Sequence, residues 1–289
     1  TFCSTLCACA PPGTLDGDTR PDLGRFYNPH CPYVAPKRYF DLYPLDTITV
    51  PDLDEAKKDL EDVPAMAIQR DSKRWPYYFD DISEDQARRC KQAYYASISF
   101  LDAQVGRLMD ALHELGLMEK TIIVFWSDHG YFLGEKGLWY KRKAFERSAR
   151  APLLIAGPGI DQGTTITQPV ELLDLYPTLA DFCRLPTPEN LEGLSLRPLL
   201  TGNPEAWTKP AALTQIWHNP KAFGYSLRTE RYRYTEWMHG EAGSELYDHQ
   251  VDGDEVTNLA MNPAFEEERK RLSAQLRTLI GDQPSQKSP

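Results

Sequence analysis

The order of secondary-structure signals between residues 84 and 185 constrains the fold more than any other feature of this chain. Apolar residues spaced alternately four and three apart predict an amphipathic helix over about 84–115, ending at Gly116. The run TIIVFW (121–126) then predicts a buried strand, and APLLIAGPG (151–159) predicts a second one. A further amphipathic helix is expected at 170–185, interrupted by Pro177. This alternation predicts an α/β fold in which helices cover a mostly parallel sheet.

The sequence on either side of this block divides the chain into three parts. Residues 1–24 carry turn signals without helical or strand periodicity, so we expect a disordered or non-native end. Residues 25–206 contain the α/β pattern. Within 207–289, short aromatic strands precede an amphipathic helix at 265–280, which predicts a small C-terminal α+β subdomain with an antiparallel sheet.

Charge and hydropathy exclude two classes of partner. The 289 residues have a formal net charge of −10, and basic residues form no long runs, so we expect no nucleic-acid binding. No apolar stretch approaches the roughly 18–20 residues that a membrane-spanning helix needs, so we expect no membrane span. The sequence makes no prediction of oligomeric state.

The first candidate for chemistry is the tetrapeptide Ser127-Asp128-His129-Gly130, which directly follows a predicted buried strand. Two adjacent side chains on a loop can both turn to one ion, so Asp128 and His129 are candidate metal ligands. A capping aspartate beside a surface histidine is the alternative. Ligand type leaves the metal open, because oxygen ligands favour Ca²⁺ or Mg²⁺ while imidazole favours Zn²⁺ or Mn²⁺.

Two further residues are candidates for binding an anion. Lys141 ends a glycine-rich turn just downstream of the predicted metal loop, and an ammonium group suits a sulfate or phosphate. His30 stands between two prolines, whose stiff backbone suits a positioned acid or anion ligand. A solvated lysine and a packed histidine are the alternatives. We expect Lys136 and Arg142 to lie outside the pocket.

Several segments, in the same order along the chain, resemble the formylglycine-dependent sulfatases. SDHGYFLGEKGLWYK is similar to the segment that supplies two metal ligands and a sulfate-binding lysine, and YNPHCPYVAPKRYFDLYP to the segment with the active-site histidine. The resemblance covers about 26–260 and is best to the iduronate-2-sulfatase-like branch. Further similar segments are FERSARAPLLIAGPG, VELLDLYPTLADF, ELYDHQVDGDEVTNLA, QAYYASISFLDAQVGRLMDAL and GYSLRTERYRYTEW.

The resemblance implies an alkaline-phosphatase-like fold and hydrolysis of the sulfate ester of a sulfated sugar or glycosaminoglycan unit. Asp128 and His129 would bind one divalent cation, usually Ca²⁺ in that family. Lys141 would bind a sulfate oxygen, and His30 would bind sulfate or protonate the leaving alcohol. His218 is a further candidate for substrate binding, with packing as the alternative. The family also implies a periplasmic or secreted location.

This sequence departs from the sulfatase pattern in two places. The formylglycine motif is Cys or Ser, any residue, Pro, any residue, Arg, and 9–13 only approaches it because Gly13 stands where Arg belongs. The N-terminal Asp pair that completes the family's metal site also has no counterpart here. We therefore expect a C-terminal portion, with formylglycine in a missing N-terminal part. Alone, this chain should show no turnover and bind Ca²⁺ weakly.

Two other functions stay open at this point. A metal-dependent phosphodiesterase or phosphatase of the same superfold also uses S-D-H-G, but needs further ligands downstream, for which His218, His239 and His249 are available. The absent nucleophile instead favours a non-catalytic protein that binds sulfate or sugar.

Overall fold

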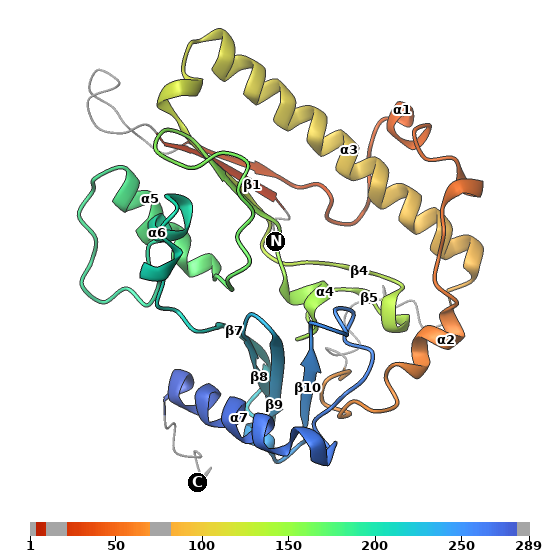
Figure 1. The fold of residues 1–289 in the computed structure, drawn as a ribbon. Helices are drawn as coiled ribbons and strands as arrows, with labels where there is room; N and C mark the ends of the chain where they lie inside the picture. Colours follow the sequence, from red (N-terminus) through yellow and green to blue (C-terminus); the bar gives the residue numbers. More distant parts are fainter. Residues whose placement is uncertain (1–3, 10–21, 70–81, 282–289) are drawn as a thin grey trace.

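The computed structural model describes residues 4–9, 22–69 and 82–281, with side chains from Phe26 onwards (Figure 1). Two four-stranded sheets organise this part of the chain, and a long helix lies along the first of them. Among the described residues, none of the helices has the length and apolar content that a membrane span requires.

The first sheet has the strand order β2-β1-β3-β6, and all three neighbouring pairs are antiparallel. The sequence predicted a mostly parallel sheet, so the pairing direction of the described strands differs from that prediction. The reason is local, because the chain between β3 and β6 returns through short elements and not through a long crossover helix. The strands are β1 (Ser4–Cys9), β2 (Asp22–Phe26), β3 (Ile122–Trp126) and β6 (Leu153–Ala156).

Helix α3 (Glu84–Glu114) begins and ends where the sequence predicted. Ser83 caps its N-terminus in a capping box with Gln86, and Gly116 follows its C-terminus with φ +66°, as expected of a terminal glycine. The face of α3 that is buried is not the apolar stripe that the sequence predicted. Leu101 and several small residues are buried, whereas Ile98 and Leu108 are exposed.

Strand β3 packs on its other side against two short helices, α5 (Leu175–Phe182) and α6 (Arg197–Leu200). Val124 of the strand and Leu175 of α5 belong to the same buried cluster. The predicted interruption at Pro177 is wrong. Proline lies in the first turn of α5, where its missing N–H would have no intrahelical partner anyway.

The second sheet, with order β10-β9-β8-β7, is fully antiparallel, and the C-terminal helix α7 lies beside it (Figure 1). Adjacent residues in a strand point to opposite faces. Leu246 packs with Leu272 of α7 on one face, while Tyr247 packs with Phe145 on the other. The elements are β7 (Ala212–Asn219), β8 (Ala222–Arg228), β9 (Tyr232–Trp237), β10 (Ser244–Asp248) and α7 (Glu266–Ile280).

The remaining short elements connect these two sheets and carry the candidate site. They are α1 (Lys37–Phe40), α2 (Leu53–Lys58), β4 (Phe132–Leu133), β5 (Trp139–Tyr140) and α4 (Glu146–Ala149). The antiparallel sheet and the terminal helix expected after residue 207 are present, while the domain boundaries at residues 24 and 206 stay predictions. The disorder expected for 1–24 is wrong for Ser4–Cys9, because these residues pair with β3 as an inner strand of the first sheet.

Candidate functional site

Asp128 and His129 lie at the C-terminal end of β3, in the loop that the sequence singled out. Because β3 is an inner strand of the sheet, its end is held on both sides by neighbouring strands. Ser127 fixes the loop further, since its hydroxyl donates to the backbone oxygen of His129 at 3.1 Å. The side chain of His129 is partly buried, with 22% exposed, whereas that of Asp128 is exposed, at 38%.

The imidazole of His129 is oriented as a metal ligand would be. Its Nδ1 lies 2.7 Å from the backbone oxygen of Gly130, and because a carbonyl only accepts, Nδ1 carries the proton. The lone pair is therefore on Nε2, which lies 3.4 Å from a carboxylate oxygen of Asp128. Ligating histidines commonly use a backbone carbonyl in this way.

The electrostatics of His129 agree with this role. Burial lowers the pKa of His129, and the positive charge of Lys141 lowers it further. The ring is thus held neutral, which metal ligation requires. Its Nε2 is buried and has no hydrogen-bond partner among the residues that the structure describes. A buried polar atom without a partner needs an explanation, and an ion is one of the few available.

Lys141 contributes a second buried polar atom, and its charge acts on His129. Its Nζ is buried and likewise has no hydrogen-bond partner within the described residues. The backbone on both sides is bent, because Tyr140 and Arg142 have φ values of +73° and +71°, in the left-handed region. Such conformations are costly for residues other than glycine and cluster at ligand-binding sites. Two residues in this costly conformation therefore flank Lys141, whose charge acts on His129.

His30 lies near these groups, since its charge contributes to the pKa of His129. Its Nδ1 is 2.5 Å from the backbone oxygen of Cys31, so the proton sits on Nδ1. The ring packs against Tyr27 with 5.0 Å between ring centroids.

A cluster of tyrosines, which sequence reasoning missed, joins the segment that carries His30 to the loop that carries Asp128 and His129. The hydroxyls of Tyr33 and Tyr131 are 2.5 Å apart, and Tyr131 stacks on Tyr94 of α3 with 5.1 Å between centroids. Burial raises the pKa of both Tyr33 and Tyr131, so both stay protonated. Asn28 adds a bond from its side-chain nitrogen to the hydroxyl of Ser97 at 2.7 Å. Helix α3 thus positions His30 and the metal loop together.

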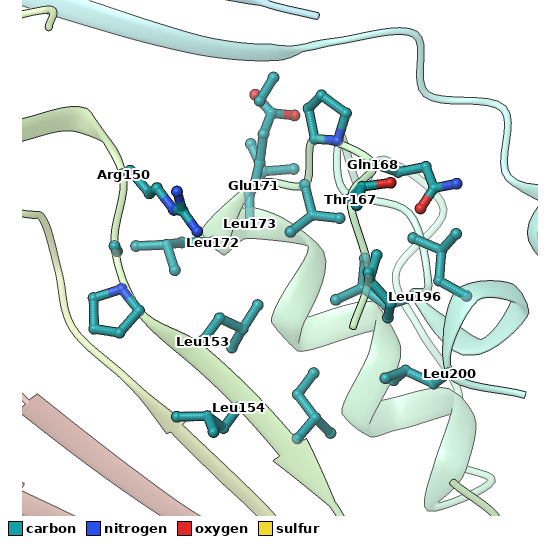
Figure 2. Close-up of a pocket in the computed structure, with 18 of the residues that line it drawn as sticks. Arg150, Leu153, Leu154, Thr167, Gln168, Glu171, Leu172, Leu173, Leu196 and Leu200 are labelled. Atoms are coloured by element: carbon teal, nitrogen blue, oxygen red, sulfur yellow. The ribbon is translucent and has the colours of Figure 1, made fainter. Parts of the chain in front are cut away.

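Asp128 and His129 also line a hollow of about 1990 Å³ between β6, α6 and β7. Its walls carry both polar and apolar side chains, and Figure 2 shows Leu153 and Leu154 of β6 on one side with Leu173, Leu196 and Leu200 across from them. His218 of β7 lines the same hollow. Its role in substrate binding stays a prediction.

Lys136, which we expected to lie outside the pocket, is a buried residue with 4% exposure. Its ammonium group donates to the backbone oxygen of Glu255 and stands over the rings of Phe145 and Tyr247. Arg142 is exposed, but it lines the same hollow as Asp128 and His129, so its expected place outside the pocket is wrong.

Asp128 and His129 offer one oxygen and one nitrogen ligand to a cation, and the charge of Lys141, which lowers the pKa of His129, is available to an anion. The two unpartnered buried atoms fit this pair of ligands, since each would gain a partner. The donor set suits a divalent cation, and further ligands would have to complete its coordination.

Comparison with known proteins gives consistent matches. A family model described as Sulfatase matches residues 26–183, and one described as N-sulphoglucosamine sulphohydrolase, C-terminal, matches residues 134–282. A protein named Sulfatase from Formosa agariphila is 36% identical over 252 residues, which cover 87% of this chain and 48% of the relative. Iduronate 2-sulfatase from Mus musculus is 32% identical over 287 residues, covering 74% of this chain and 50% of the relative.

Among solved structures, the phosphonate monoester hydrolase from Silicibacter pomeroyi superposes with a TM-score of 0.74 at 26% identity. The match covers 89% of this chain and 56% of that one. The predicted alkaline-phosphatase-like α/β fold class is confirmed by this similarity. The chain spans about half the length of the curated relatives it matches.

Proposed function

Because this chain belongs to the sulfatase family, in which its resemblance to iduronate 2-sulfatase is confirmed, we propose that it supplies the cation- and sulfate-binding part of a sulfuric ester hydrolase. One observation carries the proposal. Two buried polar atoms, Nε2 of His129 and Nζ of Lys141, face one region without partners among the described residues. A divalent cation and a sulfate oxygen would partner them.

Each residue then has a defined task. Asp128 and His129 would hold the cation, proposed to be Ca²⁺, which would supply positive charge to the sulfate oxygens. Lys141 binds a sulfate oxygen through its ammonium group and offsets the anion's charge. His30, with Nδ1 committed to the oxygen of Cys31, would carry a second proton on Nε2 and donate it to the leaving alcohol. The cysteine- or serine-based formylglycine motif does not occur in these 289 residues.

We propose a sulfated sugar as the substrate. Support comes from the names of the matching relatives, iduronate 2-sulfatase and N-sulphoglucosamine sulphohydrolase. The hollow that reaches from Asp128 to His218 offers room for rings beyond the sulfate group. A periplasmic or secreted location stays a prediction of the resemblance.

A phosphorus-ester hydrolase is the second candidate, because a phosphonate monoester hydrolase superposes well on this chain. A two-metal phosphodiesterase would need further ligands near Asp128 and His129. In the described part of the chain, His249 is bonded to Glu255 and His239 packs on Phe223, so neither serves that site. His218, the third candidate, lines the hollow with Asp128. Because two of the three histidines are engaged elsewhere, the arrangement favours the sulfatase.

Binding of matched ligands tests the proposal. Isothermal titration with Ca²⁺ present should show a sulfated monosaccharide binding more tightly than the unmodified sugar, with the gain lost in Lys141→Met. Tighter binding of the phosphorylated sugar than of the sulfated one would favour the second candidate. Equal binding of all three sugars would refute both.

A further inference from the structure

The short helix α4 connects the metal loop to the second sheet. The backbone N–H of Gly130, next to His129, donates to the backbone oxygen of Ser148 at 2.8 Å. A Cβ atom at Gly130 would lie 2.2 Å from the oxygen of Arg147 and 2.5 Å from that of Arg150. The loop and α4 are therefore in direct backbone contact, and a shift of α4 must move the loop.

The N-terminus of α4 is held by a residue more than one hundred positions away. Its own N-cap residue, Phe145, provides no side-chain acceptor. The backbone N–H of Glu146 instead donates to a carboxylate oxygen of Glu255 at 2.7 Å. Glu255 is 1% exposed and has a φ of +59°, so its backbone is bent to reach α4.

Arg233 of β9 joins the two carboxylates. Its Nε donates to Glu255 at 2.6 Å and a terminal nitrogen donates to Glu146 at 2.5 Å, while its side chain is 3% exposed. A planar guanidinium group fixes the relative position of two acceptors better than a flexible ammonium group would. Arg228 adds an ion pair to Glu146 at 3.2 Å.

The same residues could be mistaken for a metal site. Ligand atoms of Glu146, His249 and Glu255 lie within 4.8 Å of one another. Both carboxylates already face arginine, and the charge of Arg233 lowers the pKa of each against the effect of burial. A cation would have to enter beside two guanidinium groups. The cluster is an ion-pair network that needs no metal.

We propose that Arg233 and Glu255 are positioning residues, which hold α4 and through it the Asp128–His129 loop in the geometry that binds the cation. A buried ion pair is a weak means of adding stability, because an apolar cluster of the same volume would often do as well. Its directional bonds do fix where α4 lies. The consequence for ligand binding rests on the proposed function, whereas the mechanical coupling does not.

Native-state hydrogen exchange of the Gly130 amide measures the coupling directly. Arg233→Lys keeps the charge but loses the planar fork, and Glu255→Gln keeps the shape and is the milder variant if the first does not fold. Either should raise the exchange rate of the Gly130 amide at least about tenfold more than that of amides in β8 and β10. Arg231→Lys is the matched control, because Arg231 pairs with Asp248 at 2.6 Å on the opposite face of the sheet.

Uniform acceleration of all amides, or an equal effect of Arg231→Lys at Gly130, would overturn the inference and leave a purely stabilising ion pair. Titration with Ca²⁺ and sulfate separates this outcome from failure of the proposed function. If the variants accelerate exchange selectively at the Gly130 amide but the unaltered chain binds neither Ca²⁺ nor sulfate, the proposed function alone is refuted. Ligand binding with unchanged exchange at Gly130 would refute the positioning role alone.

Discussion

Replacing Lys141 by methionine should stabilise this chain, in contrast to the usual effect of a buried substitution. The ammonium group of Lys141 is buried without a partner among the described residues, and burying an unsatisfied polar group costs about 1–3 kcal/mol, more if it is charged. Methionine keeps the apolar stem and removes that cost. We expect a gain of about 1–3 kcal/mol in the free energy of unfolding, and the loss of sulfate binding.

Lys143, two residues along the chain, is the matched control. It is also buried, but its Nζ donates to the backbone oxygen of Gln69 at 2.6 Å. Lys143→Met leaves that oxygen without its donor, so it should destabilise by about 1–3 kcal/mol. Urea denaturation of the three proteins, with unchanged slope, measures both differences.

The signs of the two changes in the free energy of unfolding decide whether Lys141 is an anion ligand or a structural residue. Opposite signs, with sulfate raising the melting temperature of the unaltered chain but not that of Lys141→Met, would support an anion site at Lys141. A loss of stability in Lys141→Met as large as that in Lys143→Met would refute it, because Lys141 would then be a satisfied structural residue.

Three further predictions address the rest of the account. Asp128→Asn should weaken Ca²⁺ binding at least about tenfold in titration calorimetry, while Asp254→Asn, which alters an exposed ion pair with Arg147, should not change it. Burial raises the pKa of Glu245 to about 7. The contribution of the protonated carboxyl to stability is therefore complete below pH 4.5 and lost as the pH rises through 7. In urea denaturation at increasing pH, Glu245→Gln should reduce this fall in the midpoint. The 289-residue chain should show no sulfatase turnover with a chromogenic aryl sulfate, and robust turnover would require a nucleophile outside the family motif.

Local sequence signals predicted the elements that carry the site. Three elements have signals within a few residues of sequence. Apolar spacing indicates the capped helix over 84–114, a β-branched run indicates the buried strand before Asp128, and glycines indicate the bent loop before Lys141. Those marks place Asp128 at a strand end, but they do not show which groups meet it.

The contacts between distant residues that organise the site have no local sequence signal. Tyr33 and Tyr131 are 98 residues apart in sequence, and Arg233 and Glu146 are 87 apart, so neither pair produces a periodic pattern. The burial of Lys136 likewise depends on residues distant in sequence, because its ammonium group lies over the rings of Phe145 and Tyr247. Strand direction was missed for a similar reason, since apolar runs encode burial and not the direction of a partner.

The central claim is that Asp128, His129 and Lys141 bind a cation and a sulfate oxygen side by side. Titration calorimetry of sulfate, repeated at increasing Ca²⁺, tests it most directly. Two ligands of opposite charge in adjacent positions must raise each other's affinity by the same factor. We predict that Ca²⁺ strengthens sulfate binding in the unaltered chain and that Lys141→Met abolishes it. Sulfate binding that is indifferent to Ca²⁺ and survives Lys141→Met would contradict the account.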